Sequence, residues 1–160
     1  MNGKPSVLVL GGGPDAEREV SLVSSKSVAR ALTDAGHSVN YQVIDRPQAG
    51  ELARWGGDVV FPVLHGGWGE GGPLQDLLEL AQRPYVGCRP GAARSAMDKI
   101  ATKFMAVQRG VPTGSCAVFN PRDEGCPLGE MPVVLKPVHE GSSVGVHLCR
   151  TAAEWRDAGG

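Results

Sequence analysis

The feature that most constrains this chain is a pair of glycine-dense loops, each placed directly after a short apolar run. The first run, Ser6 to Leu10, ends at Gly11-Gly12-Gly13, and the second, Asp58 to Leu64, leads through His65 into the loop from Gly66 to Gly72. A helical pattern follows each loop. Short strands that alternate with helices predict a parallel α/β sheet, in which ligands bind beyond the carboxyl ends of the strands. We therefore expect both loops at the ligand-binding edge of one sheet.

The first predicted helix begins after Pro14 and runs to about Thr33, and Gly36 stands where a C-terminal glycine belongs. Small residues at three-to-four spacing predict the face that packs against the sheet. Its members are Ala16, Val20, Val23, Ser27, Val28, Ala31 and Leu32. A second strand is expected from Val39 to Val43, and a fourth, short strand from Tyr85 to Gly87.

The pattern changes near Pro90, which predicts a first domain over residues 1–90 and a second over 91–160. In the second we expect a helix, two antiparallel strands around a glycine-serine turn, and a helix opened by a capping box at Thr151-Ala152-Ala153-Glu154. The expected bounds are Met97 to Gln108 for the first helix, and Val133 to Lys136 and Val144 to Leu148 for the strands. These elements predict the truncated start of an α+β domain.

Composition narrows the class of ligand. Sixteen basic against 17 acidic residues give a formal net charge of -1 without a block of like charge, which disfavours nucleic acid and anionic membranes as partners. The apolar runs are far shorter than the roughly 20 residues of a membrane span, and no hydrophobic signal region follows Met1. We expect a cytoplasmic protein with small ligands. The four cysteines show no C-x-x-C pair, so free thiols are expected and not a metal site.

A carboxylate stands out in the first glycine loop. The stretch from Gly11 to Ala16 loosely matches the G-x-G-x-x-A dinucleotide fingerprint, but Glu17 comes next. A carboxylate about 4 Å from a phosphate would cost roughly 4 kcal/mol at an effective dielectric of 20, whereas it would suit the ammonium of an amino acid. A role limited to the helix dipole explains Glu17 equally well. A Rossmann oxidoreductase whose ribose partner is Asp45 stays open as the alternative.

The second loop and two lysines complete the candidates. His65 and Glu70 flank a loop whose backbone amides are expected to approach an anion or a carboxylate, although a lone histidine at a strand end is more often structural. Lys136 ends an apolar run beside the donor-rich turn from Glu140 to Gly145, so a phosphate is its natural partner. Lys99 is either a second phosphate contact or, more simply, an ordinary first-turn lysine.

Four strings occur in the order in which they occur in D-alanine–D-alanine ligases, a family of ATP-grasp enzymes. They are Gly12 to Ser21, Leu64 to Glu70, Ser95 to Lys99 and Lys136 to Gly145, and the resemblance covers essentially the whole chain. Among them, A-E-R-E-V-S and E-G-S-S-V-G are the most specific. The resemblance implies a parallel, Rossmann-like pre-ATP-grasp domain for substrate binding, followed by the incomplete, ATP-binding start of an α+β ATP-grasp domain.

The resemblance also implies a role for each candidate. Glu17 would hold the ammonium of the first D-alanine, and His65 would lie near its carboxylate and the acyl phosphate, with Glu70 in the same substrate site. Lys99 and Lys136 would contact the ATP phosphates. Ser142 would belong to the hydrogen-bond network that orients Glu17. The phosphate-covering turn would comprise Glu140, Gly141, Ser142, Ser143 and Gly145.

The implied reaction joins two D-alanine molecules through a D-alanyl phosphate, with ATP and Mg²⁺ as cofactors, to supply peptidoglycan precursors. The resemblance further implies a homodimer built through the first domain. D-Lactate or D-serine as the second substrate stays open, as does a non-catalytic binding module or damaged gene product. The family's magnesium ligands would fall after Gly160, so we expect these 160 residues to be inactive alone. Gly71 departs from the acidic residue that the family usually has there.

Overall fold

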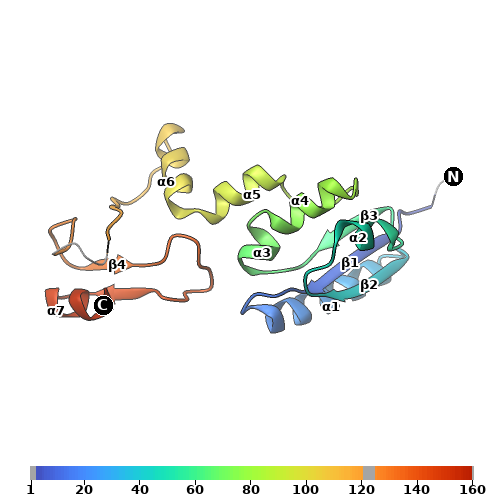
Figure 1. Ribbon diagram of the computed structural model, residues 1–160, viewed down its shortest axis with the longest axis horizontal. Helices are drawn as coiled ribbons and strands as arrows, with labels where there is room; N and C mark the ends of the chain where they lie inside the picture. The colour runs from blue at the N-terminus through green and yellow to red at the C-terminus, as the bar shows by residue number, and fades with distance from the viewer. Residues whose placement is uncertain (1–2, 121–124, 160) are drawn as a thin grey trace. The chain divides into compact units, whose positions relative to one another are not determined.

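The computed structural model describes residues 3–120 and 125–159. The chain divides into two compact units, Met1–Met97 and Asp98–Gly160, and each is described by itself (Figure 1). The division falls after Met97, whereas the sequence placed a domain boundary after residue 90. Residues 91–97 fall in the first unit, where the Arg94 guanidinium pairs with the Asp76 carboxylate. The assignment of the two functional domains stays a prediction.

Unit 1 is a parallel α/β sheet, as the sequence predicts. Its three strands lie in the order β2-β1-β3, and both neighbours run parallel to β1. The expected fourth strand is reduced to a single parallel bridge between Tyr85 and Val60. The elements are β1 (Val7–Gly12), α1 (Arg18–Asp34), β2 (Val39–Ile44), α2 (Ala49–Arg54), β3 (Val59–Pro62), α3 (Gly66–Glu70), α4 (Pro73–Leu80) and α5 (Pro90–Met97).

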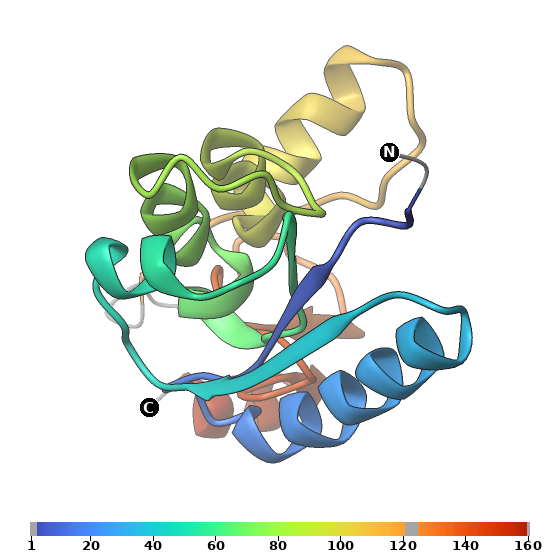
Figure 2. The same ribbon diagram turned by 90° about the vertical axis from the view of Figure 1, so that its right-hand side faces the viewer.

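The central strand β1 is buried on both faces, and its side chains alternate between two helical layers. Leu8 and Leu10 pack with residues of α2 and α4, whereas Gly11 faces α1. Figure 2 shows α1 in blue on one face of the sheet and α2 and α4, in teal and green, on the other. The buried core on the α2 and α4 side consists of Leu8, Leu10, Ile44, Leu52, Val60, Leu64, Leu74 and Leu78. Burial on both faces is typical of the central strand in such sheets.

The face of α1 that packs against the sheet differs from the predicted one. Ser21 and Ser25 are fully buried, whereas Val20 and Val23 are 57% and 69% exposed. The reason is the closeness of α1 to β1. A Cβ added to Gly11 would lie 2.1 Å from the Ser25 hydroxyl oxygen, so only small side chains fit between the helix and the strand. The valine-bearing face is therefore turned toward solvent.

Three further differences concern helices. The glycine loop from residue 66 forms the short helix α3, and the sequence did not predict α2. The helix expected from Met97 to Gln108 is α6 (Lys99–Gln108), and α5 precedes it as a separate helix. Asp98 separates the two, because its backbone is extended and its side chain caps α6. Among the described residues, no helix is long and apolar enough to cross a membrane.

Unit 2 pairs two strands and covers them with a helix. Strand β4 (Val133–Leu135) runs antiparallel to β5 (His147–Cys149), as predicted but with shorter strands, and α7 (Ala152–Ala158) follows. The Thr151 hydroxyl accepts a hydrogen bond from the Glu154 amide at 3.2 Å, which confirms the predicted helix start. A small core of Val133, Cys149 and Trp155 lies between the helix and the strands, and the rings of Phe119 and Trp155 are 4.6 Å apart.

Replacement of Ser21 by alanine tests the contact between α1 and β1. The Ser21 hydroxyl accepts from the Gly12 amide at 2.9 Å and donates to the Val63 carbonyl, so the change leaves two buried backbone groups without a partner. We expect Ser21→Ala to lower the free energy of unfolding by about 1–3 kcal/mol in urea denaturation. Ser27→Ala, on the exposed side of the same helix, is the control and should change it by less than about 0.5 kcal/mol. Equal effects of the two substitutions would contradict the assignment.

Candidate functional site

The carboxyl ends of β1 and β3 lie at the same edge of the sheet because the two strands are parallel neighbours. The chain leaves β1 through the loop that carries Glu17, and it leaves β3 shortly before His65. Glu17 occupies the N-cap position of α1, but its side chain makes no capping hydrogen bond. The fold thus brings both predicted substrate residues to the edge where ligands of parallel sheets bind.

His65 is the most informative side chain at this edge. Its Nδ1 lies 3.4 Å from Glu70 Oε1, and Glu70 Oε2 accepts a hydrogen bond from the Gly66 amide at 3.2 Å. Its Nε2 is buried, and it has no hydrogen-bond partner within the described part of the chain. A buried polar atom without a partner costs free energy, so such atoms often mark a place where a ligand completes the bonding. Glu70 therefore contacts one ring nitrogen, and the other has no partner within the described part of the chain.

The backbone amides of the second glycine loop do not form the expected anion site. Those of Trp68 and Gly69 donate to Asp15 Oδ2, at 2.9 and 3.4 Å. The amide of Gly66 donates to Glu70, that of Gly71 to the Gly67 carbonyl, and that of Gly72 to the Gln75 side chain. These five donors are engaged within the protein, so the expectation of a backbone cradle for an anion is wrong for them. Side chains are left to define the chemistry of this edge.

The glycines of the first loop are explained by close packing within the protein. A Cβ at Gly11 would meet Ser25 at 2.1 Å, one at Gly12 the Ile44 carbonyl at 2.6 Å, and one at Gly13 the Leu64 side chain at 2.9 Å. In a dinucleotide site, glycines instead leave room for a pyrophosphate. The spaces beside Gly11, Gly12 and Gly13 are filled by the protein's own atoms, which weakens the oxidoreductase alternative.

Arg18 adds to this argument. Its Nη1 donates to the carbonyls of Gly13 and Ile44, at 2.6 and 2.9 Å, and lies 4.0 Å from Asp45. The guanidinium thus joins the ends of β1 and β2 and stands beside the carboxylate that the alternative assigns to a ribose. The oxidoreductase alternative needs the Asp45 carboxylate to bind a ribose, but that carboxylate already has a cationic neighbour.

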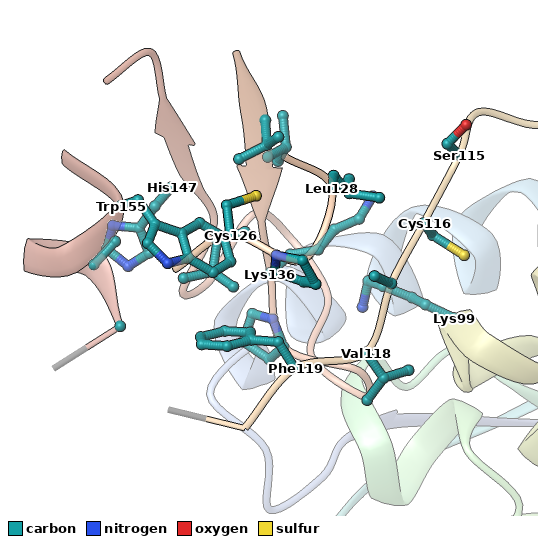
Figure 3. A pocket seen from close by; sticks show the side chains of 18 of the residues that line it. Lys99, Ser115, Cys116, Val118, Phe119, Cys126, Leu128, Lys136, His147 and Trp155 are labelled. Carbon is teal, nitrogen blue, oxygen red and sulfur yellow. The ribbon is translucent and has the colours of Figure 1, made fainter. Parts of the chain in front are cut away.

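In unit 2, Lys99 and Lys136 line one cavity of about 1110 Å³ although they lie far apart in the sequence. Figure 3 shows both lysines with Phe119, Trp155 and Leu128 among the lining residues. A cavity with cationic groups and apolar, aromatic walls suits a ligand with an anionic part and a flat apolar part. Lys136 follows the last residue of β4 and is exposed, while the base of α6 supplies Lys99.

Lys99 also holds the turn that follows Lys136. Its Nζ donates to the carbonyls of Val138, at 3.2 Å, and Glu140, and its amide donates to Val138 at 3.2 Å. Ser142 and Ser143 both adopt positive φ, 47° and 62°, in this turn. Of the five predicted turn residues Gly145 lines the cavity, whereas Glu140, Gly141, Ser142 and Ser143 are not among the lining residues. The roles of these residues stay predictions.

Two aspartates were missed by sequence reasoning. Asp98 Oδ1 accepts from the amides of Ile100 and Ala101, at 2.8 and 2.9 Å, and so begins the helix that presents Lys99. An aspartate directly before a helical run is an N-cap signal, so this role was open to prediction. Asp15 contacts residues 53 and 54 positions later in the chain, and no local pattern predicts such contacts.

Comparisons with known proteins point in one direction. Residues 47–88 match the family model described as D-ala D-ala ligase N-terminus. The D-alanine–D-alanine ligase of Syntrophotalea carbinolica is 42% identical over 149 residues, which are 92% of this chain and 49% of that protein. The ligase of Bordetella pertussis is 43% identical over 141 residues, 86% of this chain and 45% of that protein. The chain spans about half the length of the curated relatives that it matches.

Solved structures agree with this likeness. The D-alanine–D-alanine ligase of Coxiella burnetii superposes with a TM-score of 0.83 at 27% identity, over 97% of this chain and 59% of that one. The ligase of Helicobacter pylori, at 22% identity and a TM-score of 0.77 over the same shares, shows the likeness of fold alone.

The parallel sheet and the antiparallel second unit define an α/β protein with the fold of the solved ligases. Within that class, the chain belongs to the D-alanine–D-alanine ligase family, and it corresponds to that family's N-terminal half.

Acid should loosen the start of α6. The hydrogen bond from the Ala101 amide lowers the pKa of the Asp98 carboxyl below its ordinary value, and the Ile100 amide adds to this effect against partial desolvation. A lowered pKa means that the cap contributes stability above the unfolded-state pKa and loses it as pH falls through the folded-state pKa. We expect the amides of Ile100 and Ala101 to lose exchange protection below about pH 4. Asp98→Asn, which caps without titrating, should remove this dependence, and its persistence would contradict the assignment.

Removal of the Lys99 ammonium should loosen the turn after β4. We expect Lys99→Met to speed hydrogen exchange at the amides of Val144 and Val146, which bond within this turn, by about tenfold. Lys103→Met is the matched control on the same helix, because its Nζ instead contacts Thr113 and Gly114. Unchanged exchange in the Lys99 variant would show that the lysine does not hold the turn.

Proposed function

We propose that the protein acts in the ATP-dependent joining of two D-alanine molecules, through a D-alanyl phosphate, to supply peptidoglycan precursors. The likeness to ligases over most of the chain supports this proposal. The single structural observation that carries it is the meeting of Lys99 and Lys136 at one cavity with apolar walls. A cytoplasmic homodimer belongs to the same proposal by family analogy.

The residues at the sheet edge would handle the amino acid. Glu17 would pair with the ammonium of the first D-alanine, since a carboxylate there suits a cation better than a phosphate. The buried Nε2 of His65 would contact the substrate carboxylate and then the acyl phosphate formed from it. Glu70, which lies 3.4 Å from the opposite ring nitrogen, would fix the orientation of the imidazole.

The second unit would handle the nucleotide. Lys99 and Lys136 would bind the phosphates, and the apolar walls with Phe119 and Trp155 would take the base. Ser142 and the turn from Glu140 to Gly145 would cover the phosphates. These groups fit ATP by charge and by cavity size. The described residues contain no cluster of three or more acidic, histidine or cysteine side chains that could hold Mg²⁺.

The proposed reaction has two steps. The carboxylate of the first D-alanine attacks the γ-phosphorus of ATP, which forms D-alanyl phosphate and releases ADP. The amine of the second D-alanine then attacks the acyl carbon, the C–N bond forms, phosphate leaves and the nitrogen loses a proton. Positioning of the reactants and neutralisation of phosphate charge would supply most of the rate acceleration.

The activity test measures ADP release that depends on added D-alanine, with the dipeptide identified by mass. It uses the 160-residue chain and any longer product of the same reading frame. L-Alanine is the control for the first substrate, and D-lactate and D-serine compete with D-alanine as the second. Release of ADP with D-alanyl-D-alanine as product supports the proposal. A longer product that binds ATP but forms no dipeptide or depsipeptide would refute it.

The nucleotide assignment yields a separate prediction. We expect Lys99→Met and Lys136→Met each to weaken ATP binding to the 160-residue chain at least tenfold in calorimetry, because each removes a charge-assisted contact. Adenosine, which lacks phosphates, should bind the variants and the parent alike. Lys26→Met, an exposed lysine of α1, is the control for loss of one charge. Equal losses for ATP and adenosine would contradict phosphate binding, and NADH binding in place of ATP would favour the oxidoreductase alternative.

A further inference from the structure

Asp15 joins the two loops that leave the sheet edge. It lies in the loop between β1 and α1, two residues before Glu17. Its Oδ2 accepts hydrogen bonds from the amides of Trp68, at 2.9 Å, and Gly69, at 3.4 Å. These amides belong to the first turn of α3, whose N-cap residue is His65. One carboxylate oxygen thus connects the segment that carries Glu17 with the segment that carries His65.

The packing around Asp15 is close and specific. Gly66 has a φ of +85°, and a Cβ at this position would lie 2.5 Å from the Asp15 Cβ. The side chain of Asp15 therefore occupies the space that any larger residue at 66 would need. A glycine at the start of α3 lets the carboxylate reach the amides beyond it.

The charge of Asp15 bears on the same site. Backbone amides at the start of a helix attract anions, and here the carboxylate of Asp15 already satisfies two of them. A substrate carboxylate would have to displace Asp15 to bind there. The buried Nε2 of His65, without a partner in the described part of the chain, is instead the group at this edge that awaits an acceptor or donor.

We propose that Asp15 is a positioning residue of the ligase site. Its carboxylate fixes the first turn of α3 and thereby sets the position of the His65 imidazole relative to Glu17. The inference rests on the proposed function for the roles of His65 and Glu17, but the contact with α3 does not. Loss of the carboxylate should loosen α3 without unfolding the unit, because Gly69 is also held by a bond from the Gln75 side chain to its carbonyl at 2.9 Å.

The first arm of the test is structural and needs no activity. Hydrogen exchange is measured by NMR on the 160-residue chain, its Asp15→Ala and Asp15→Asn variants, and the control Asp34→Asn, which changes an exposed aspartate of α1. We expect Asp15→Ala to lower protection of the Trp68 and Gly69 amides about tenfold or more. Asp15→Asn, which keeps an acceptor oxygen, should restore most of it, and Asp34→Asn should leave both amides unchanged.

The second arm measures the rate of dipeptide formation. It uses whichever protein of the activity test above, the 160-residue chain or a longer product, forms the dipeptide. We expect Asp15→Ala to lower kcat by about ten- to a hundredfold with the KM for ATP unchanged, and Asp15→Asn to recover most of the rate. A change of stability alone would reduce the amount of folded enzyme and leave the KM for D-alanine unchanged. Misplacement of His65 and Glu17 would raise that KM as well.

The outcomes separate the two proposals. Lost amide protection in Asp15→Ala, together with no ligase activity in a longer product that keeps Asp15, would refute the proposed function and leave the contact of Asp15 with α3 established. Full activity and an unchanged KM for D-alanine in Asp15→Ala would overturn the positioning role. If Asp15→Ala fails to fold, Asp15→Asn still decides, because it keeps one acceptor oxygen for the Trp68 and Gly69 amides and should retain their protection and most of the rate. Loss of the rate in Asp15→Asn while both amides stay protected would overturn the inference.

Discussion

The close approach of helix α1 to strand β1 is the contact on which the rest of unit 1 depends. Ser25 lies where a side chain at Gly11 would be, and Ser21 binds both the Gly12 amide and the Val63 carbonyl. One buried hydroxyl therefore links the end of β1 to the segment that follows β3. Since Glu17 and His65 come shortly after these two points, their common location at the sheet edge follows from a contact made by small residues.

The fold class was predictable because apolar runs that alternate with helical patterns are typical of a parallel α/β sheet. The orientation of α1 was not, because periodicity favours the valines and the structure buries the serines. The orientation of α1 depends on strand β1, against which the helix packs. Gly11 lacks a side chain, so the helix can come close enough for serine hydroxyls to satisfy backbone groups. Where a helix lies beside a glycine-bearing strand, small polar residues therefore predict its buried face better than large apolar residues do.

The glycine loops illustrate the same limit at the candidate site. Their glycines suggested amides that reach a ligand, whereas the amides of α3 bind Asp15 and Glu70. Helix α3 itself was not predictable, because three of its five residues are glycines and its first turn depends on a carboxylate distant in the sequence. Charged side chains in unexpected surroundings were better guides. Lys136 was singled out because it ends an apolar run, and it lines the cavity with Lys99.

Lys99 holds the turn after β4 and also lines the cavity, so in the proposed function it would link the turn to a bound anion. An ammonium group has three donors, and the carbonyls of Val138 and Glu140 accept two hydrogen bonds from it. A phosphate oxygen would complete the set without displacing either carbonyl. The same group would then bind the nucleotide and hold the turn that the proposal places over the phosphates. A lysine suits this double task because its three donors surround one point charge, whereas the planar fork of an arginine directs its donors toward a single bidentate partner.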